Sequence, residues 1–158
     1  MTVPLLAPTV GAPTPAAAVT TLRSRGLRAS TARRAVLAAL FEAEAPLTAE
    51  ELAVRTTPCS DLASVYRNLE TLETHGLVRH IHIGHGPGRY LTAGARDEFV
   101  ACERCGAFER VAPAVLRAVR DAVHAAVGYR VRCSHFPLAG LCPACAGDTM
   151  EDGHVRPR

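Results

Sequence analysis

Two pairs of cysteines carry the sharpest chemical signal in this sequence. The pairs are Cys102-x-x-Cys105 and Cys142-x-x-Cys145, and each can bind one metal ion from a tight turn. Two such turns complete a tetrahedral shell of four thiolates, which selects zinc over magnesium or calcium. Because no position is left open for water, the pattern predicts a structural zinc, and such sites contribute roughly 10–16 kcal/mol in zinc-finger peptides. Redox-active pairs and an iron–sulfur cluster are the alternatives.

The hydropathy of the chain and its N-terminal residues indicate the cellular compartment in which these cysteines lie. The chain has no run of eighteen apolar residues, so we expect no membrane span. The N-terminus carries four prolines before residue 16 and no basic stretch, which argues against a signal peptide. We therefore expect a cytoplasmic, reducing location, where cysteines are metal ligands or free thiols. Cys59 and Cys133 are predicted to be buried thiols, with a sensory role as the alternative.

The basic residues are unevenly placed. The net charge is only +3, but all 18 basic residues are arginines, and five of them lie between residues 19 and 41, where there is no acid. Such a local cluster is typical of a surface that meets phosphates. The cluster consists of Arg23, Arg25, Arg28, Arg33 and Arg34.

The first half of the chain reads as short helices followed by a hairpin. A segment at 19–25 ends at a glycine, and a second helix follows Ser30 or Thr31. A capping box at 48–51 opens a third helix, and Asp61 caps a fourth that runs to His75. Alternating residues at 77–83, a glycine-rich loop and a return strand from Arg89 complete the order of a winged helix-turn-helix. The apolar face of the fourth helix is predicted to comprise Leu62, Val65, Leu69 and Leu72.

The second half mixes strands with one long helix. Short strands are expected at 99–101 and 108–111, then a helix from Pro113 to Gly128, then a strand at 129–141. The helix stripe comprises Val115, Leu116, Val119, Val123 and Ala126. The fold class is α+β: an N-terminal winged helix-turn-helix, then a small α/β domain with the four-cysteine site. The predicted boundaries are 1–18 (flexible tail), 19–88 (winged-helix DNA-binding domain), 89–147 (zinc-containing domain) and 148–158 (flexible tail).

The fourth helix has a polar face that suits base recognition. Its polar residues are Ser64, Tyr66, Arg67, Asn68 and Thr71. The second helix of a helix-turn-helix enters the major groove with its N-terminal part. Arginine can there bind guanine through two hydrogen bonds, and tyrosine can meet a thymine methyl group or a phosphate. From the residues alone, an ordinary solvated face is the alternative.

Together these motifs resemble the ferric uptake regulator family. The stretch 61–69, with Leu72 and the Gly76-Leu77-Val78 that follow, is similar to the recognition helix of that family. The 22–37 region resembles its N-terminal entry, 46–52 its third helix, and the two cysteine pairs its structural zinc site. The resemblance runs from about Thr21 to Cys145.

The resemblance implies a partner and a set of contacts. It implies a homodimer, with 89–147 as its α/β dimerisation domain. It also implies that the dimer represses transcription from an A·T-rich palindromic operator in double-stranded DNA when a metal is bound. Tyr66 and Arg67 match the major-groove contacts, Arg28 a minor-groove contact and Arg33 a phosphate contact. We add Ser64 and Asn68, on the same helix face, as DNA-binding candidates.

The sequence departs from the family where the regulatory metal binds. The usual histidine-rich run is replaced by Arg96-Asp97-Glu98-Phe99, and other ligand places hold Ala45, Leu91 or Ala93, and Arg110. Arg117 stands where an acid is expected in the helix, and the last histidine is shifted by one residue. We therefore expect an atypical sensor, built from the wing histidines or from a changed hinge site. The candidates are His80, His82 and His85 on the wing, and Asp97, Glu98, His124 and His135 at the hinge.

Three functions compete at this stage. The first is a repressor gated by a divalent metal, with zinc, iron, manganese or nickel as the second ion. The second keeps the DNA-binding fold without metal gating. The third is a zinc-ribbon interaction module without DNA binding, which the arginine cluster argues against. An enzyme is not expected, because no nucleophile and base are paired and the zinc shell is closed.

Overall fold

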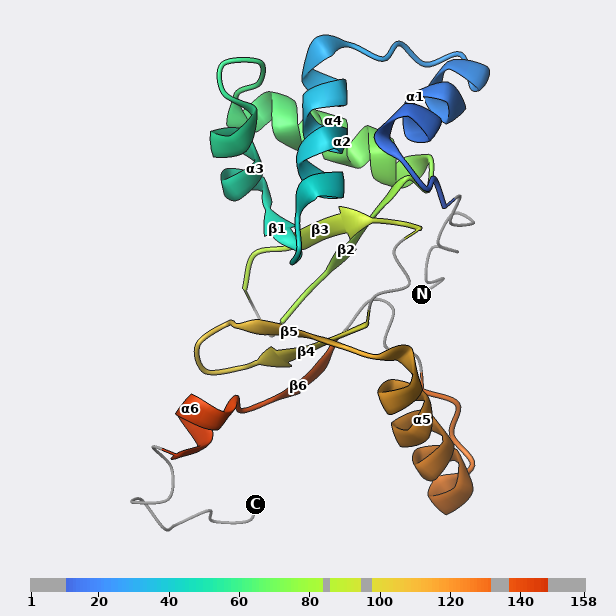
Figure 1. The fold of residues 1–158 in the computed structure, drawn as a ribbon, viewed down its shortest axis with the longest axis vertical. Coiled ribbons are helices and arrows are strands. Elements are labelled where there is room, and N and C mark those ends of the chain that lie inside the picture. The colour runs from blue at the N-terminus through green and yellow to red at the C-terminus, as the bar shows by residue number, and fades with distance from the viewer. Residues whose placement is uncertain (1–10, 84–85, 95–97, 132–136, 148–158) are drawn as a thin grey trace, which may run out of the picture. The chain divides into compact units, whose positions relative to one another are not determined.

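The computed structural model describes residues 11–83, 86–94, 98–131 and 137–147. The chain divides into two compact units (Figure 1). The first unit holds residues up to 82 together with 87–96, and the second holds 97–158 together with 83–86. Among the described residues, no helix is long and apolar enough to cross a membrane.

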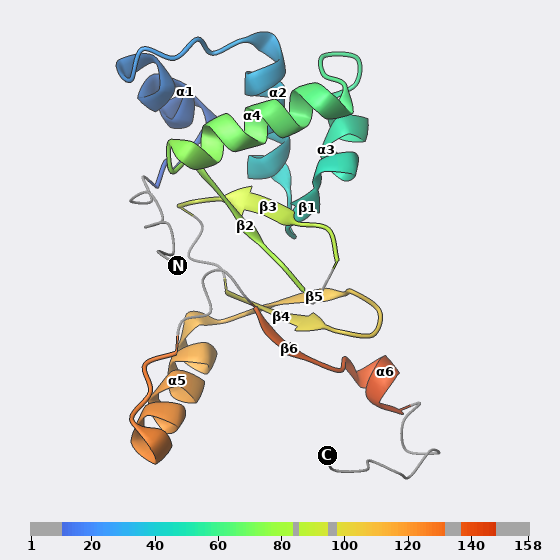
Figure 2. The ribbon, with the colours of Figure 1, turned by 180° about the vertical axis from the view of Figure 1, so that it is seen from behind.

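The first unit packs four helices with a small antiparallel sheet. The helices are α1 (Pro15–Ser24), α2 (Thr31–Glu42), α3 (Ala49–Thr56) and α4 (Leu62–Thr74). The strands β1 (Leu47–Thr48), β2 (Val78–Ile81) and β3 (Arg89–Thr92) lie in the order β1-β3-β2. Figure 2 shows α4 crossing α2, with the sheet next to the ends of these helices. This arrangement is a winged helix-turn-helix, as predicted, with β2 and β3 forming the wing.

Each helix begins at a residue that suits its N-terminus. The side chains of Thr14, Ser30 and Asp61 accept hydrogen bonds from the first turns of α1, α2 and α4. Thr48 and Glu51 form the predicted capping box of α3, with both reciprocal hydrogen bonds present. Polar groups at these positions replace the bonding partners that the first backbone N–H groups of a helix lack.

The core of this unit is aliphatic. Leu22 of α1, Leu37 of α2 and Leu52 of α3 are fully buried, and the α4 residues Val65, Leu69 and Leu72 pack into the same cluster. The predicted α4 stripe is therefore correct for three of its four residues. Leu62 is the exception, since it is 40% exposed at the first turn of the helix.

Two sequence-based boundaries differ from the structure. Helix α1 begins at Pro15 instead of 19, because proline fits the first turn of a helix and Thr14 supplies the cap. The predicted N-terminal tail is therefore helical from residue 15. Strand β3 pairs with both β1 and β2, so residues 89–92 belong to the winged-helix sheet. The boundary expected after residue 88 falls near residue 96, and the tail expected at 148–158 lies outside the described residues.

The second unit contains a three-stranded sheet and two helices. Its strands are β4 (Glu98–Cys102), β5 (Phe108–Val111) and β6 (Leu138–Gly140), in the order β5-β4-β6. Strand β6 runs parallel to β4, and among the described residues of the predicted 129–141 strand only 138–140 are in it. The helices α5 (Pro113–Val127) and α6 (Pro143–Gly147) lie at opposite ends of the sheet (Figures 1 and 2).

Helix α5 leaves most of its apolar stripe uncovered. Of the predicted stripe residues only Leu116 is buried within the chain. Val115 is 52% exposed and Val127, in the last turn, is 64% exposed. Helix α5 therefore carries more apolar surface than one copy of this chain buries.

A candidate zinc site and a candidate DNA-binding surface

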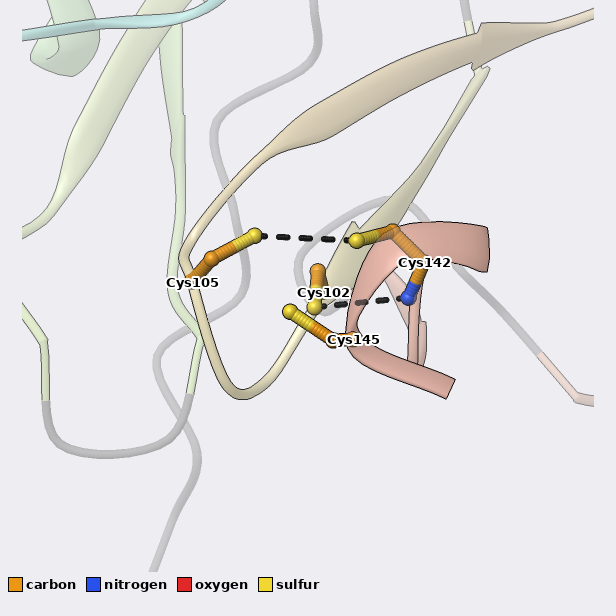
Figure 3. A group of neighbouring side chains, drawn as sticks. All are labelled: Cys102, Cys105, Cys142 and Cys145. Carbon is orange, nitrogen blue, oxygen red and sulfur yellow. Dashed lines mark hydrogen bonds between the residues drawn. The ribbon is translucent and has the colours of Figure 1, made fainter. Parts of the chain in front are cut away.

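The four predicted cysteines meet in the second unit. Cys102 ends β4 and Cys105 follows in the turn before β5, while Cys142 precedes α6 and Cys145 lies within it. Their sulfur atoms point toward one another (Figure 3) and all lie within 4.8 Å of one another. Because β6 lies beside β4, the two pairs, almost forty residues apart along the chain, come together at one end of the sheet.

The geometry fits a tetrahedral zinc ion. The Sγ atoms of Cys105 and Cys142 are 3.8 Å apart. With zinc–sulfur bonds of about 2.3 Å, two sulfurs of a regular tetrahedron lie about 3.8 Å apart. The turn after Cys105 uses Gly106 at a φ of 73°, a left-handed conformation that glycine adopts without strain. The site therefore has the ligand number, ligand type and spacing of a closed structural zinc centre.

The local hydrogen bonds prepare one sulfur for metal binding. The backbone amide of Cys142 donates to Sγ of Cys102 at 3.4 Å. Backbone hydrogen bonds from Cys105 and Cys142 lower the pKa of the Cys102 thiol to about 6. The hydrogen bond with Cys142, followed by burial, raises the pKa of Cys145 to about 12. Because Cys145 holds its proton at neutral pH, zinc binding to its thiolate must release that proton.

The recognition helix exposes some of its predicted DNA contacts. Arg67 is exposed on α4 and Tyr66 is 45% exposed. The hydroxyl of Tyr66 donates to Oε1 of Glu50 on α3 at 3.1 Å. Arg28 is exposed just before α2, and Ser64 is half-buried in the first turn of α4. These four side chains lie on the surface of the winged-helix unit.

Two other predicted DNA contacts are occupied inside the protein. Asn68 is only 6% exposed, and its Nδ2 donates to the Ser64 carbonyl at 2.9 Å. Its Oδ1 accepts a hydrogen bond from Nε of Arg33 at 3.1 Å, and Nη1 of Arg33 donates to the Arg28 carbonyl at 2.7 Å. These bonds and its burial turn the Asn68 side chain toward the protein interior. Arg33 joins α2 to α4 and to the segment that carries Arg28.

Of the hinge candidates for a regulatory metal, the structure describes Glu98 and His124. Oε1 and Oε2 of Glu98 accept from Nη1 of Arg120 at 2.9 and 3.1 Å, so an arginine already neutralises this carboxylate. His124 is exposed on α5. Asp97 and His135 lie outside the described residues. Leu91 and Phe99, at expected ligand places, are buried apolar residues.

The wing candidates are closer together. The rings of His80 and His82 lie 4.9 Å apart, and Nδ1 of His80 contacts Oε1 of Glu73, a residue that the sequence analysis did not single out. Glu73 lies near the C-terminal end of α4. The only sequence signal for this contact is that α4 ends shortly before the wing strand. His85 and Cys133 lie outside the described residues. Cys59 is exposed, which contradicts its prediction as a buried thiol, because the loop between α3 and α4 leaves it uncovered.

A winged-helix unit followed by an α/β unit with a four-cysteine metal site defines a class of metal-containing regulatory proteins. The model of the ferric uptake regulator family matches residues 24–136, which is more than half of the chain. The protein belongs to the ferric uptake regulator family.

Curated relatives match along most of their length. The ferric uptake regulation protein of Bacillus subtilis is 28% identical over 138 residues, covering 82% of this chain and 93% of that protein. The peroxide-responsive repressor of Staphylococcus saprophyticus is 25% identical over 130 residues, covering 80% and 88%. Among solved structures, the Helicobacter pylori ferric uptake regulator, described as having three functional metal binding sites, superimposes with a TM-score of 0.65 at 20% identity, covering 84% and 94%. These matches confirm the fold expected from the sequence.

Proposed function

We propose that this protein is a homodimeric transcriptional repressor that binds an A·T-rich palindromic operator in double-stranded DNA. The carrying observation is the exposed pair Tyr66 and Arg67 on the recognition helix of a winged-helix unit. Curated relatives of similar length are named as repressors or regulators, which supports the same function. Such a protein works where DNA is, in the cytoplasm of a bacterial cell.

In this proposal the exposed and buried polar groups have different tasks. Arg67 reads a guanine in the major groove, and Tyr66 meets a thymine methyl group or a phosphate. Arg28 reaches the minor groove, and Ser64 contacts the backbone. Asn68 and Arg33 hold α4 against α2, so they set the orientation in which α4 presents its surface residues.

The second unit supplies stability and the dimer contact. One zinc ion per chain binds Cys102, Cys105, Cys142 and Cys145 and fixes the end of the β4–β6 pair. A second copy of the chain covers the exposed apolar stripe of α5. Two recognition helices related by a twofold axis then read a palindrome, because protein symmetry and operator symmetry match.

Regulation by a divalent metal is the atypical part of the proposal. One relative is named for ferric uptake regulation and another as peroxide-responsive. The proposed signal for this chain is a second ion such as zinc, iron, manganese or nickel. The hinge route is weakened by the Glu98–Arg120 pair. A family regulator that binds DNA without metal gating is therefore the second candidate.

The test is a DNA-binding titration with the full, zinc-containing protein. The probe is a fluorophore-labelled DNA fragment from the promoter of the gene that encodes this protein. The protein should bind it with an affinity that falls steeply as the salt concentration rises, because phosphate contacts release counterions. Arg67→Ala should weaken binding by about 1–3 kcal/mol and relax base preference at one position. Arg55→Ala, an exposed arginine in the last turn of α3, is the matched control. Equal losses in both variants, binding that ignores salt, or no binding would contradict the proposal, and no binding would favour an interaction module.

A further inference from the structure

The recognition helix carries one exposed side chain whose hydrogen bond is made to a neighbouring helix. The hydroxyl of Tyr66 on α4 lies 3.1 Å from Oε1 of Glu50, which is in the first turn of α3. Both side chains are exposed on the winged-helix unit. The second helix of a helix-turn-helix faces the base edges with its N-terminal part. Glu50 therefore places a carboxylate beside the phenol with which the recognition helix would meet DNA.

The protonation of the two groups fixes the direction of this hydrogen bond. A hydrogen bond from its own backbone amide is the largest cause that lowers the pKa of Glu50 below its ordinary value. Partial burial, followed by the hydrogen bond with Glu50, raises the pKa of Tyr66. Glu50 is thus an anion and Tyr66 a neutral phenol at neutral pH, and an ionised carboxylate can only accept. The single hydroxyl proton of Tyr66 therefore points to Glu50, and the phenol oxygen keeps only its capacity to accept.

This direction decides which groups of DNA the phenol can meet. Phosphate oxygens and the O6 and N7 atoms of guanine accept hydrogen bonds, so they need a donor that Tyr66 no longer offers. The carboxylate of Glu50 also repels nearby phosphates, because both are negatively charged. The amino group of adenine or cytosine can donate to the phenol oxygen, and the ring can pack on a thymine methyl group. Only a pair of adenine and thymine offers a methyl and an amino group together in the major groove.

We propose that Glu50 is a specificity-determining residue that acts through Tyr66 and makes the recognition helix favour A·T over G·C pairs. The inference rests on the proposed function and decides between the two contacts considered there for Tyr66, in favour of the thymine methyl group. A free tyrosine hydroxyl rotates to suit either a donor or an acceptor. Bound to Glu50 it loses that freedom, so the protein binds DNA less tightly but discriminates better between base pairs.

The experiment measures the affinity of the zinc-containing protein for a set of duplexes by fluorescence anisotropy. The duplexes derive from the bound promoter fragment, with each thymine replaced in turn by uracil, which lacks the methyl group, and each A·T pair by G·C. The Tyr66 position is the one at which uracil weakens binding by the parent protein but not by Tyr66→Ala. There we expect uracil to weaken parent binding about fourfold, as for one buried methyl group, and G·C to weaken it about tenfold or more.

The variants separate the hydroxyl from the charge. Glu50→Ala should bind the parent duplex more tightly, and its loss of affinity for G·C should shrink to less than about threefold, because the freed hydroxyl can donate to guanine O6. In a Tyr66→Phe background, which keeps the ring, Glu50→Ala should leave the discrimination against G·C unchanged, since its action requires the hydroxyl. Glu70→Gln removes a negative charge from an exposed position one turn later on α4 and is the matched control. It should tighten binding to all duplexes equally.

A second measurement needs no DNA. The phenols of the parent and Glu50→Ala proteins are titrated by ultraviolet absorbance, with Tyr66→Phe identifying the signal of Tyr66, which should ionise at lower pH once Glu50 is removed. An unchanged titration would overturn the inference, and so would discrimination against G·C that Glu50→Ala retains or that Glu70→Gln lowers as much. In each of these cases DNA binding by the parent protein would leave the repressor intact. A parent protein that binds none of the duplexes would overturn the proposed function and this inference together.

Discussion

The buried contact between Asn68 and Arg33 allows a direct test of what the polar residues of α4 do. The Asn68→Ala change removes an amide that is 6% exposed and accepts a hydrogen bond from the charged Arg33. The same amide donates to the Ser64 carbonyl and, at 3.5 Å, to the Ser64 hydroxyl. A hydrogen bond to a charged group contributes about 1.5–3 kcal/mol, and the Ser64 carbonyl already accepts within the helix. Since Arg33 is half-exposed and can regain water, we expect a loss near the lower end, about 1.5–2 kcal/mol.

The assay is hydrogen exchange of the backbone amides in α4, which reports on the winged-helix unit by itself. The free energy of opening should fall by the same amount for all the slowest amides of the helix, because they are protected by one cooperative unit. In a double-mutant cycle, Arg33→Ala and Asn68→Ala should couple by about 1 kcal/mol. Thr71→Ala, which removes a local hydrogen bond to the Arg67 carbonyl on the same helix, is the control and should change little.

The reasoning fails if Asn68→Ala leaves α4 as protected as before and instead abolishes preference for one base pair. That pattern would make Asn68 a base-reading residue, as the sequence alone suggested. A loss of protection with a uniform loss of DNA affinity across operator variants is the expected pattern, because a misplaced helix weakens every contact together.

Three further predictions concern other elements. Cys105→Ser should reduce bound zinc to below one ion per chain by elemental analysis and lower the helical circular dichroism of the second unit, whereas Cys59→Ser, at an exposed cysteine outside the cluster, should keep full zinc. Zinc affinity, measured by chelator competition, should fall as the pH drops through about 6, the pKa of Cys102, because protons then compete with zinc for that sulfur. An affinity that does not change with pH would argue against thiolate ligands. Thr48→Ala should lower the free energy of unfolding of the first unit by about 1 kcal/mol, because it removes the α3 capping box. Urea unfolding measures this loss, and the control Thr57→Ala, which removes only an exposed hydrogen bond, should not show it.

The sequence predicted structural features correctly where they depend on residues a few positions apart. The capping box at Thr48, the cap at Asp61 and the two cysteine pairs all depend on short spacing, and the structure reproduces each of them. The winged-helix order followed from the change in periodicity after Gly76. Strand β1, only two residues long, carries no periodic signal and becomes visible only through its pairing with β3.

Sequence reasoning was less successful where a residue's partner is distant along the chain. Asn68 looked like part of a polar surface, but Arg33, thirty-five positions earlier, turns it inward. Glu98 looked like a metal ligand until its pairing with Arg120 of α5 was known. Helix α1 was placed too late because Pro15 lies in a proline-rich stretch, although proline at the first turn is compatible with a helix.

The Glu98–Arg120 pair has a consequence for what this protein can sense. A metal-binding carboxylate is a reversible device, since its cation leaves when the cell runs short or when a chelator is added. The guanidinium of Arg120 stays protonated at every physiological pH. Because it is part of the chain, the positive charge beside Glu98 does not vary with the concentration of any ion. At this carboxylate the chain carries a permanent counterion in place of a variable one. The charge of Glu98 is therefore balanced by Arg120 whether or not the cell is short of metal.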